Sequence, residues 1–221
     1  MPSLSLAIGL GANLGDPLLT LTAVRPQLAA LFDAQLRLRW SPLFRTAPVG
    51  GPPDQPDYLN AVLLVETPAA MPPSPPSPPP ATPSTPSAPD PAGEAAARAE
   101  SPASRWPEPQ ALLQRMQELE LRFGRRRREH WGPRLLDLDL LWCAPHRCDS
   151  PELTLPHPLL TQRTFVLAPL LAIDPALRLP SAALPSPGAS PQPLRPLLEH
   201  LLPQRPEPAP ERLPPQPGWP E

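Results

Sequence analysis

Proline is the residue that most limits how this chain can fold, because it accounts for 44 of the 221 residues, whereas its average usage is about 5%. A proline inside a helix or a central strand removes a backbone donor and disrupts the element. Residues 68–107 combine dense prolines with serine and alanine and have almost no large apolar side chains. Such a segment cannot bury enough surface to offset the entropy of ordering it, so the sequence predicts a disordered insertion with local polyproline II structure.

A second proline-rich segment, residues 204–221, is predicted to be a disordered tail. The remaining residues predict a single domain, residues 1–203, which the insertion interrupts. Proline-rich segments also serve as ligands for domains that recognise polyproline II helices. An interaction role for the insertion therefore stays open beside a passive one.

Outside these segments, hydrophobic periodicity predicts a mixture of strands and helices. Asp16 followed by Pro17 is typical of a helix start, and Pro26 is expected to kink or shorten that helix. The order of elements favours an α+β fold, a ferredoxin-like sandwich with helices on one face of a mainly antiparallel sheet. The expected strands are 4–10, 35–45 with a break at Pro42, 58–67, 136–140 and a short one before His157; the expected helices are 17–32, 108–124, one from about 164, and 194–202.

Charge and the other global features point to a soluble cytoplasmic protein. The formal net charge is −2, which argues against a general nucleic-acid-binding protein. The N-terminus lacks the basic and apolar regions of a signal peptide, and no run of about 18 apolar residues could span a membrane. Cys143 and Cys148 are too few for a disulfide framework, and their spacing around His146 fits a zinc site poorly. We expect a monomer that binds neither nucleic acid nor membranes.

The run WGPRLLDLDLL, residues 131–141, carries the strongest chemical signal. Asp137 and Asp139 alternate with leucines, so they share one face of a strand, with Cβ atoms roughly 6.5–7 Å apart. Two carboxylates at that separation can hold one or two hard cations, and magnesium binds through one or two carboxylates together with substrate phosphates. Polar residues on the wet face of a half-buried strand are the alternative explanation.

Three further groups of residues could act with the aspartates. Seven arginines precede or enter the motif, and they suit either a charged surface or the closing of positive groups over polyphosphate. His157 and Arg163 lie in or after a proline-bounded loop, and Asn60 lies on a predicted strand beside Tyr58. A carboxamide offers both a donor and an acceptor to a heterocycle. The chain has neither a Walker loop nor a G-x-G-x-x-G motif, which disfavours P-loop kinases and Rossmann enzymes. The arginines are Arg115, Arg122, Arg125, Arg126, Arg127, Arg128 and Arg134.

These motifs, in this order, resemble the 6-hydroxymethyl-7,8-dihydropterin pyrophosphokinases of folate biosynthesis. The matching segments are IGLGANLGDP, FRTAPVGGPPDQPDYLNAV, WGPRLLDLDLL and LTLPHPLLTQRTFVLAPL. The resemblance covers roughly residues 1–67 and 108–202. It implies an enzyme that transfers the β,γ-diphosphate of ATP to the pterin hydroxymethyl group and releases AMP.

The resemblance also implies roles for individual residues. Asp137 and Asp139 would bind magnesium, in two ions with ATP, and Arg125 and Arg134 would stabilise the transferring group. The positions matching the ATP site are Gln117, Glu120, Arg127, His157 and Arg163. The positions matching the pterin pocket, where two aromatic rings enclose the bicycle, are Thr46, Val49, Tyr58, Asn60, Trp131 and Phe165.

The chain departs from the family pattern at a few positions. His130 stands where many relatives carry another arginine, Pro158 follows His157 where some have tyrosine, and Ala47 replaces a common proline. None of these changes affects the two aspartates. Two other functions stay open: a proline-rich interaction protein on a decayed enzyme fold, and a different magnesium-dependent phosphoryl transferase or nuclease.

Overall fold

The computed structural model describes residues 4–68, 106–125, 132–186 and 188–220. At its centre lies a six-stranded sheet in which all pairs are antiparallel, with the order β10-β3-β4-β1-β5 and with β2 also pairing with β4. The strands are β1 (Ser5–Ala12), β2 (Arg37–Trp40), β3 (Phe44–Thr46), β4 (Tyr58–Glu66), β5 (Asp137–Cys143) and β10 (Glu211–Arg212). The predicted α+β class with a mainly antiparallel sheet is confirmed, and the ferredoxin-like arrangement stays a prediction.

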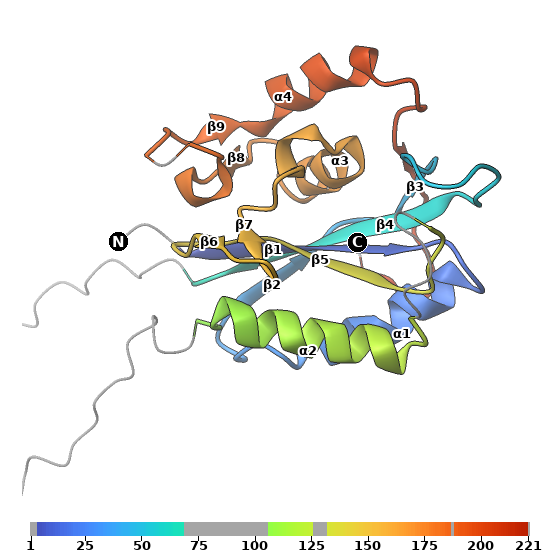
Figure 1. The fold of residues 1–221 in the computed structure, drawn as a ribbon, viewed down its shortest axis with the longest axis horizontal. Helices are drawn as coiled ribbons and strands as arrows, with labels where there is room; N and C mark the ends of the chain where they lie inside the picture. Colours follow the sequence, from blue (N-terminus) through green and yellow to red (C-terminus); the bar gives the residue numbers. More distant parts are fainter. Residues whose placement is uncertain (1–3, 69–105, 126–131, 187, 221) are drawn as a thin grey trace, which may run out of the picture.

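Helices cover both faces of this sheet, so the prediction of helices on one face was wrong (Figure 1). Two of them, α1 (Pro17–Ala29) and α2 (Pro109–Arg122), lie on one face. On the other lie α3 (Thr164–Ile173) and α4 (Leu194–Leu201). The physical reason is visible in β4, where six consecutive residues are buried. A strand that is apolar on both sides must be covered on both sides.

The two faces of β1 belong to two separate hydrophobic clusters. Leu6, Ile8 and Leu10 pack with α1 and α2, whereas Ala7 packs with Leu64, Trp142 and residues of α3. Side chains alternate along a strand, so one short segment contributes to both cores. Full burial of each leucine or isoleucine stabilises the fold by about 1.5–3 kcal/mol.

The local signals at the start of α1 were read correctly. Asp16 is the N-cap, its carboxylate accepts a hydrogen bond of 2.9 Å from the backbone of Leu19, and Pro17 is the first helical residue. Pro26 lies inside the helix, which ends at Ala29. One short strand was expected before His157, and it is β7 (Thr154–Leu155). The short elements that the sequence did not predict are β6 (Cys148–Asp149), β8 (Arg178–Leu179), β9 (Gln192–Pro193), η2 (Leu160–Gln162), η3 (Ser181–Ala183) and η4 (Leu202–Gln204).

The C-terminal segment was predicted to be disordered, and the structure contradicts this. Strand β10 pairs with β3, and the backbone nitrogen of Leu213 donates to Leu43 O over 2.9 Å. Trp219 is only 6% exposed, its Nε1 donates to Ser41 O over 2.8 Å, and its ring lies edge-on to Trp40. Proline lacks the backbone donor but not the side-chain surface, so a proline-rich chain can still pack where it carries a large aromatic anchor.

Most of the predicted insertion, residues 69–105, lies outside the described residues, so its disorder stays a prediction. Its last two residues belong to the fold instead. Trp106 is 9% exposed within the core, and Pro107 O accepts from the Cys143 thiol over 3.8 Å. Among the described residues, no helix has both the length and the apolar character that crossing a membrane requires.

Candidate functional site

Three central strands bring the proposed metal and heterocycle residues onto one face of the sheet. Asp139 pairs with Gly9 and Asp137 with Gly11, and Gly11 also pairs with Asn60 on the next strand. Partners in an antiparallel ladder point to the same face. Asp137 and Asp139 therefore share a face of the sheet, as the period-two pattern predicted. Asn60 lies on the same face, with Gly11 between it and Asp137.

A cavity of about 270 Å³ lies over this face. Its walls come from β1, the loop after β3, the start of β4, β5 and the start of α3. The structure brings together at this cavity many of the residues predicted from the sequence: Thr46, Val49, Tyr58, Asn60, Arg134, Asp137, Asp139, Arg163 and Phe165.

Asp137 lies between two arginines. Arg125 Nη1 and Arg134 Nη1 each lie 2.9 Å from its Oδ1. Burial and the neighbouring Asp139 carboxylate raise the pKa of Asp137, and the two guanidinium groups oppose that shift. The charge on this aspartate is thus balanced by side chains from two different segments of the chain.

Asp139 has a separate cationic partner. Arg163 Nη1 lies 2.7 Å from Asp139 Oδ2 and 3.3 Å from His157 Nε2, and its guanidinium stacks 5.4 Å from the centre of the Phe165 ring. His157 Nδ1 accepts a hydrogen bond of 3.0 Å from the backbone of Leu159. The proton of the neutral ring therefore lies on Nε2.

Two donors thus converge at His157 and Arg163, and such an arrangement suits an anionic oxygen. Burial and the charge of Arg163 lower the pKa of His157. The histidine does not line the cavity itself but contacts Arg163, which does. The pair therefore presents two hydrogen-bond donors beside Asp139.

Two buried polar residues, Asn60 and Thr46, also line the cavity. Asn60 Nδ2 donates to Thr46 Oγ1 over 2.7 Å. A Cβ atom on Gly11 would lie 2.9 Å from Asn60 Oδ1, so glycine is required there to keep this carboxamide in place. Asn60 Oδ1 remains an acceptor for a ligand edge, and Val49 and Phe165 supply apolar surface nearby.

Tyr58 lines the cavity near the arginines. Its hydroxyl donates to Gly132 O over 3.3 Å, and burial raises the pKa of its phenol. A neutral, half-buried tyrosine adds flat surface and one polar tip. The pocket therefore combines a carboxamide, a hydroxyl and aromatic faces, which suits a flat polar heterocycle.

Glu120 and Gln117 lie on α2 and do not line the cavity. Glu120 is 4% exposed, accepts a hydrogen bond of 2.8 Å from the backbone of Leu138, and forms an ion pair with Arg125. Burial raises its pKa to about 7. In this structure Glu120 positions Arg125 against Asp137. Arg127 and Trp131, also predicted for the site, lie outside the described residues.

Sequence reasoning missed several residues at the site. Asn13 is 3% exposed, and its side chain accepts a hydrogen bond of 2.8 Å from the backbone of Arg134. Gly9, Gly11, Arg205 and Glu207 line the cavity. The glycines alternate in IGLGAN, and that spacing could have indicated an open strand face. Nothing local in the proline-rich C-terminal segment indicated Arg205 or Glu207.

The donor set at Asp137 and Asp139 fits a hard divalent cation. The ion pairs with the arginines use Oδ1 of Asp137 and Oδ2 of Asp139. Within the described part of the chain, no third His, Cys, Asp or Glu completes a metal cluster with these two carboxylates. Two carboxylates without further protein ligands match magnesium, which takes its other ligands from phosphates and water.

The sequence is similar to those of known enzymes. The chain is 32% identical over 189 residues to the 2-amino-4-hydroxy-6-hydroxymethyldihydropteridine pyrophosphokinase of Mycobacterium tuberculosis (strain H37Rv), covering 81% of this chain and 78% of that protein. The proteins of the same name from Pseudomonas aeruginosa and Haemophilus influenzae are 33% and 30% identical, covering 78% and 80% of this chain and 82% and 86% of theirs. Residues 7–74 and 95–175 match a family profile. The chain belongs to the 7,8-dihydro-6-hydroxymethylpterin-pyrophosphokinase family.

Proposed function

We propose that this protein transfers the β,γ-diphosphate of ATP to the hydroxymethyl group of 6-hydroxymethyl-7,8-dihydropterin, giving AMP and the pterin diphosphate in folate biosynthesis. The single observation that carries the proposal is the shared face of Asp137, Asp139 and Asn60. A carboxylate pair for metal-bound phosphates and a carboxamide for a heterocycle thus lie in one cavity. Family membership supports the same reaction.

Asn60 and Thr46 would hold the polar edge of the pterin, while Phe165, Tyr58 and Val49 would pack against its ring. The hydroxymethyl group would then point along the sheet toward Asp139. Its oxygen attacks the β-phosphorus of ATP, the bond from that phosphorus to the α–β bridging oxygen breaks, AMP leaves, and the hydroxyl proton passes to water. No side chain has to act as a strong base, since positioning and charge stabilisation dominate such transfers.

The cationic groups would receive the phosphates. Arg125 and Arg134 now contact Asp137, and Arg163 contacts Asp139. When phosphates arrive, these guanidinium groups can bind them bidentately. His157 Nε2–H would donate to a phosphate oxygen beside Arg163. Gln117, Arg127 and Trp131 keep the roles that the family resemblance implies, as predictions.

Asp137 and Asp139 would hold the magnesium ions, two with ATP, which neutralise phosphate charge and align the transferring group. We also propose that the protein acts as a monomer in the cytoplasm. The central strands and helices would have the ferredoxin-like arrangement that the sequence predicted. The proposal involves neither nucleic acid nor membranes.

The test uses the full chain with ATP, magnesium and 6-hydroxymethyl-7,8-dihydropterin. Chromatography should show AMP and pterin diphosphate formed in equal amounts, and AMP should not form when the pterin is omitted. ADP as the nucleotide product, or AMP release that does not depend on the pterin, would overturn the proposal. A parallel reaction with guanosine in place of the pterin controls for general transfer to hydroxyl groups.

A further inference from the structure

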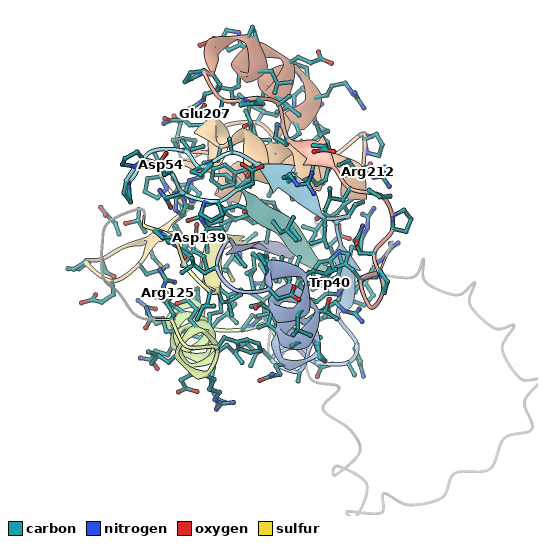
Figure 2. All side chains as sticks on the ribbon, turned by 90° about the vertical axis from the view of Figure 1, so that its right-hand side faces the viewer. Trp40, Asp54, Arg125, Asp139, Glu207 and Arg212 are labelled. Atoms are coloured by element: carbon teal, nitrogen blue, oxygen red, sulfur yellow. The ribbon has the colours of Figure 1, made fainter. Side chains whose placement is uncertain are left out.

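The C-terminal strap, residues 203–219, runs from the end of α4 past the cavity to the opposite side of the sheet. Two of its side chains, Arg205 and Glu207, line the same cavity as Asp139 and Asn60. In Figure 2, Glu207 lies on the same side of the view as Asp139, whereas Arg212, later in the strap, lies on the other side with Trp40. The strap therefore forms part of the cavity wall before it leaves the site.

The strap joins the sheet at β3, and the loop after β3 supplies Val49 to the cavity. Glu211 pairs with Arg45 and Arg212 with Phe44 in antiparallel register. Beyond these two pairs, Val49 in the loop after β3 and Glu207 in the strap both line the cavity. Glu207 therefore shares the cavity with Val49, one of the residues proposed to pack against the heterocycle.

Arg205 connects the strap to the segment just before α3. Its Nη2 donates to the backbone oxygen of Gln162, the residue before Arg163. Gln162, Thr164 and Phe165 all line the cavity. Arg205 is therefore held at the edge where the start of α3 meets the heterocycle pocket.

Both ends of this segment are fixed, so its side chains have defined positions. Arg205 is bonded to Gln162 at one end, and β10, the Leu213–Leu43 hydrogen bond and the buried Trp219 hold the other end. Arg205 and Glu207 are both partly buried rather than fully exposed. Binding to a preformed wall avoids the entropy cost of ordering it.

We propose that Arg205 and Glu207 are binding residues for the heterocyclic substrate and help to determine its specificity. This inference rests on the function proposed above. An unpaired carboxylate repels a polyphosphate, whereas it can accept hydrogen bonds from the amino and ring N–H groups of a neutral heterocycle. The guanidinium of Arg205 supplies a planar donor that can stack on or bond to the ring. The strap is thus an additional wall of the pterin pocket.

The test compares Glu207→Ala and Arg205→Ala with two controls from the same strap, Glu211→Ala and Arg212→Ala. The controls remove the same charges at exposed positions that do not line the cavity. We expect each cavity variant to raise the KM for the pterin by about three- to tenfold, as the loss of one hydrogen bond predicts. The KM for ATP and kcat should change by less than about twofold, and both controls should match the unchanged protein.

Three results would overturn the inference: an unchanged pterin KM in both cavity variants, equal increases in the KM values of both substrates, or control variants as impaired as the cavity variants. Thermal unfolding of all four variants separates a binding effect from a loss of folded protein. Fluorescence titration with the pterin alone supplies a second measurement that needs no turnover. If the unchanged protein shows no pterin-dependent AMP, the proposed function fails; if it is active and Glu207→Ala and Arg205→Ala bind pterin normally, only this inference fails.

Discussion

Asn13 and Arg134 are joined by two hydrogen bonds, one between their backbones and one from the Arg134 backbone to the Asn13 side chain. The backbone nitrogen of Asn13 donates to Arg134 O over 3.0 Å, and the backbone nitrogen of Arg134 donates to Asn13 Oδ1 over 2.8 Å. Asn13 Nδ2 also donates to Pro56 O over 3.1 Å. One buried carboxamide therefore joins the turn after β1, the loop before β4 and the segment that carries Arg134.

Replacing Asn13 by alanine should misplace Arg134 and leave buried backbone groups unpaired. We expect kcat/KM to fall by about 10- to 100-fold, because small displacements of positioning groups are costly. The free energy of unfolding should fall by about 1–3 kcal/mol. Steady-state kinetics and urea denaturation measure the two effects. Asn13→Asp keeps the acceptor for Arg134 but loses the donor to Pro56 O and buries a charge, so it should restore the activity only in part.

Gly11→Ala should weaken pterin binding, because its Cβ would lie 2.9 Å from Asn60 Oδ1 and displace the carboxamide. Gly9→Ala is a matched control on the same strand, since its Cβ would meet Asp139 Cβ at an ordinary 3.8 Å. We expect the KM for the pterin to rise about tenfold or more for Gly11→Ala only. Equal KM values in the two variants would show that Asn60 does not hold the substrate.

Asp137→Asn and Asp139→Asn should each reduce turnover by about 100-fold or more, because a carboxamide replaces a charged magnesium ligand with a weaker neutral one. The fold should survive, since the amide keeps the size of the side chain. Initial rates over a range of magnesium concentrations measure the effect, and circular dichroism checks the fold. Asp149→Asn, at an exposed position on β6, serves as the control. Near-normal rates in both active-site variants would refute the metal assignment.

Glu120 should make stability depend on pH. Its pKa is raised from 4.5 to about 7 in the folded protein, so between these values the folded state binds more protons than the unfolded state. Stability should therefore fall as pH rises through this window, by roughly 3 kcal/mol at most from this group. Glu120→Gln keeps an acceptor for the Leu138 N–H and should flatten the dependence.

Guanidinium denaturation at pH 4.5, 6 and 8 tests this expectation. Glu118→Gln is the control, because that side chain lies on the same helix but is 55% exposed. An identical slope of unfolding free energy against pH in the Glu120→Gln variant and the unchanged protein would contradict the prediction. The pKa of Asp137 is shifted in the same direction, so some dependence of stability on pH should remain in the Glu120→Gln variant.

Trp219→Ala should destabilise the protein by about 3–5 kcal/mol, the usual cost of removing a buried aromatic side chain. The indole is 6% exposed and its ring centre lies 5.7 Å from that of Trp40. Trp219→Phe keeps most of the packing but loses the hydrogen bond to Ser41 O. It should therefore lower the free energy of unfolding by only about 1 kcal/mol. A denaturation midpoint unchanged by Trp219→Ala would show that the strap is not anchored there.

Local patterns predicted the elements of the site well. The period-two spacing of Asp137 and Asp139 placed both on one strand face, and Asp16 with Pro17 placed the start of α1. These predictions succeeded because they depend on backbone geometry within a few residues. The roles of the predicted site residues stay predictions, although the cavity gathers most of the described ones.

Features that depend on distant contacts were missed. The continuous apolar run in β4 is typical of a strand covered on both faces, so that signal was present but was interpreted as one-sided. The order of the C-terminal strap had no such signal, because composition alone favoured disorder. The strap is held by Trp219, which packs against Trp40, and by the pairing of β10 with β3. Composition describes the average tendency of a segment, whereas one well-placed aromatic anchor can order it.

The hydrogen bond between Trp219 and Ser41 joins residues 178 positions apart. On the ribosome, Trp40 and Ser41 emerge well before Trp219, which follows Ser41 by 178 residues. The packing between α1 and the sheet is therefore complete only when the strap has been added. Because contacts of such long sequence separation slow folding, we expect native Trp40 packing to form only after residue 219 has emerged, and nascent chains truncated before residue 219 to remain sensitive to proteases.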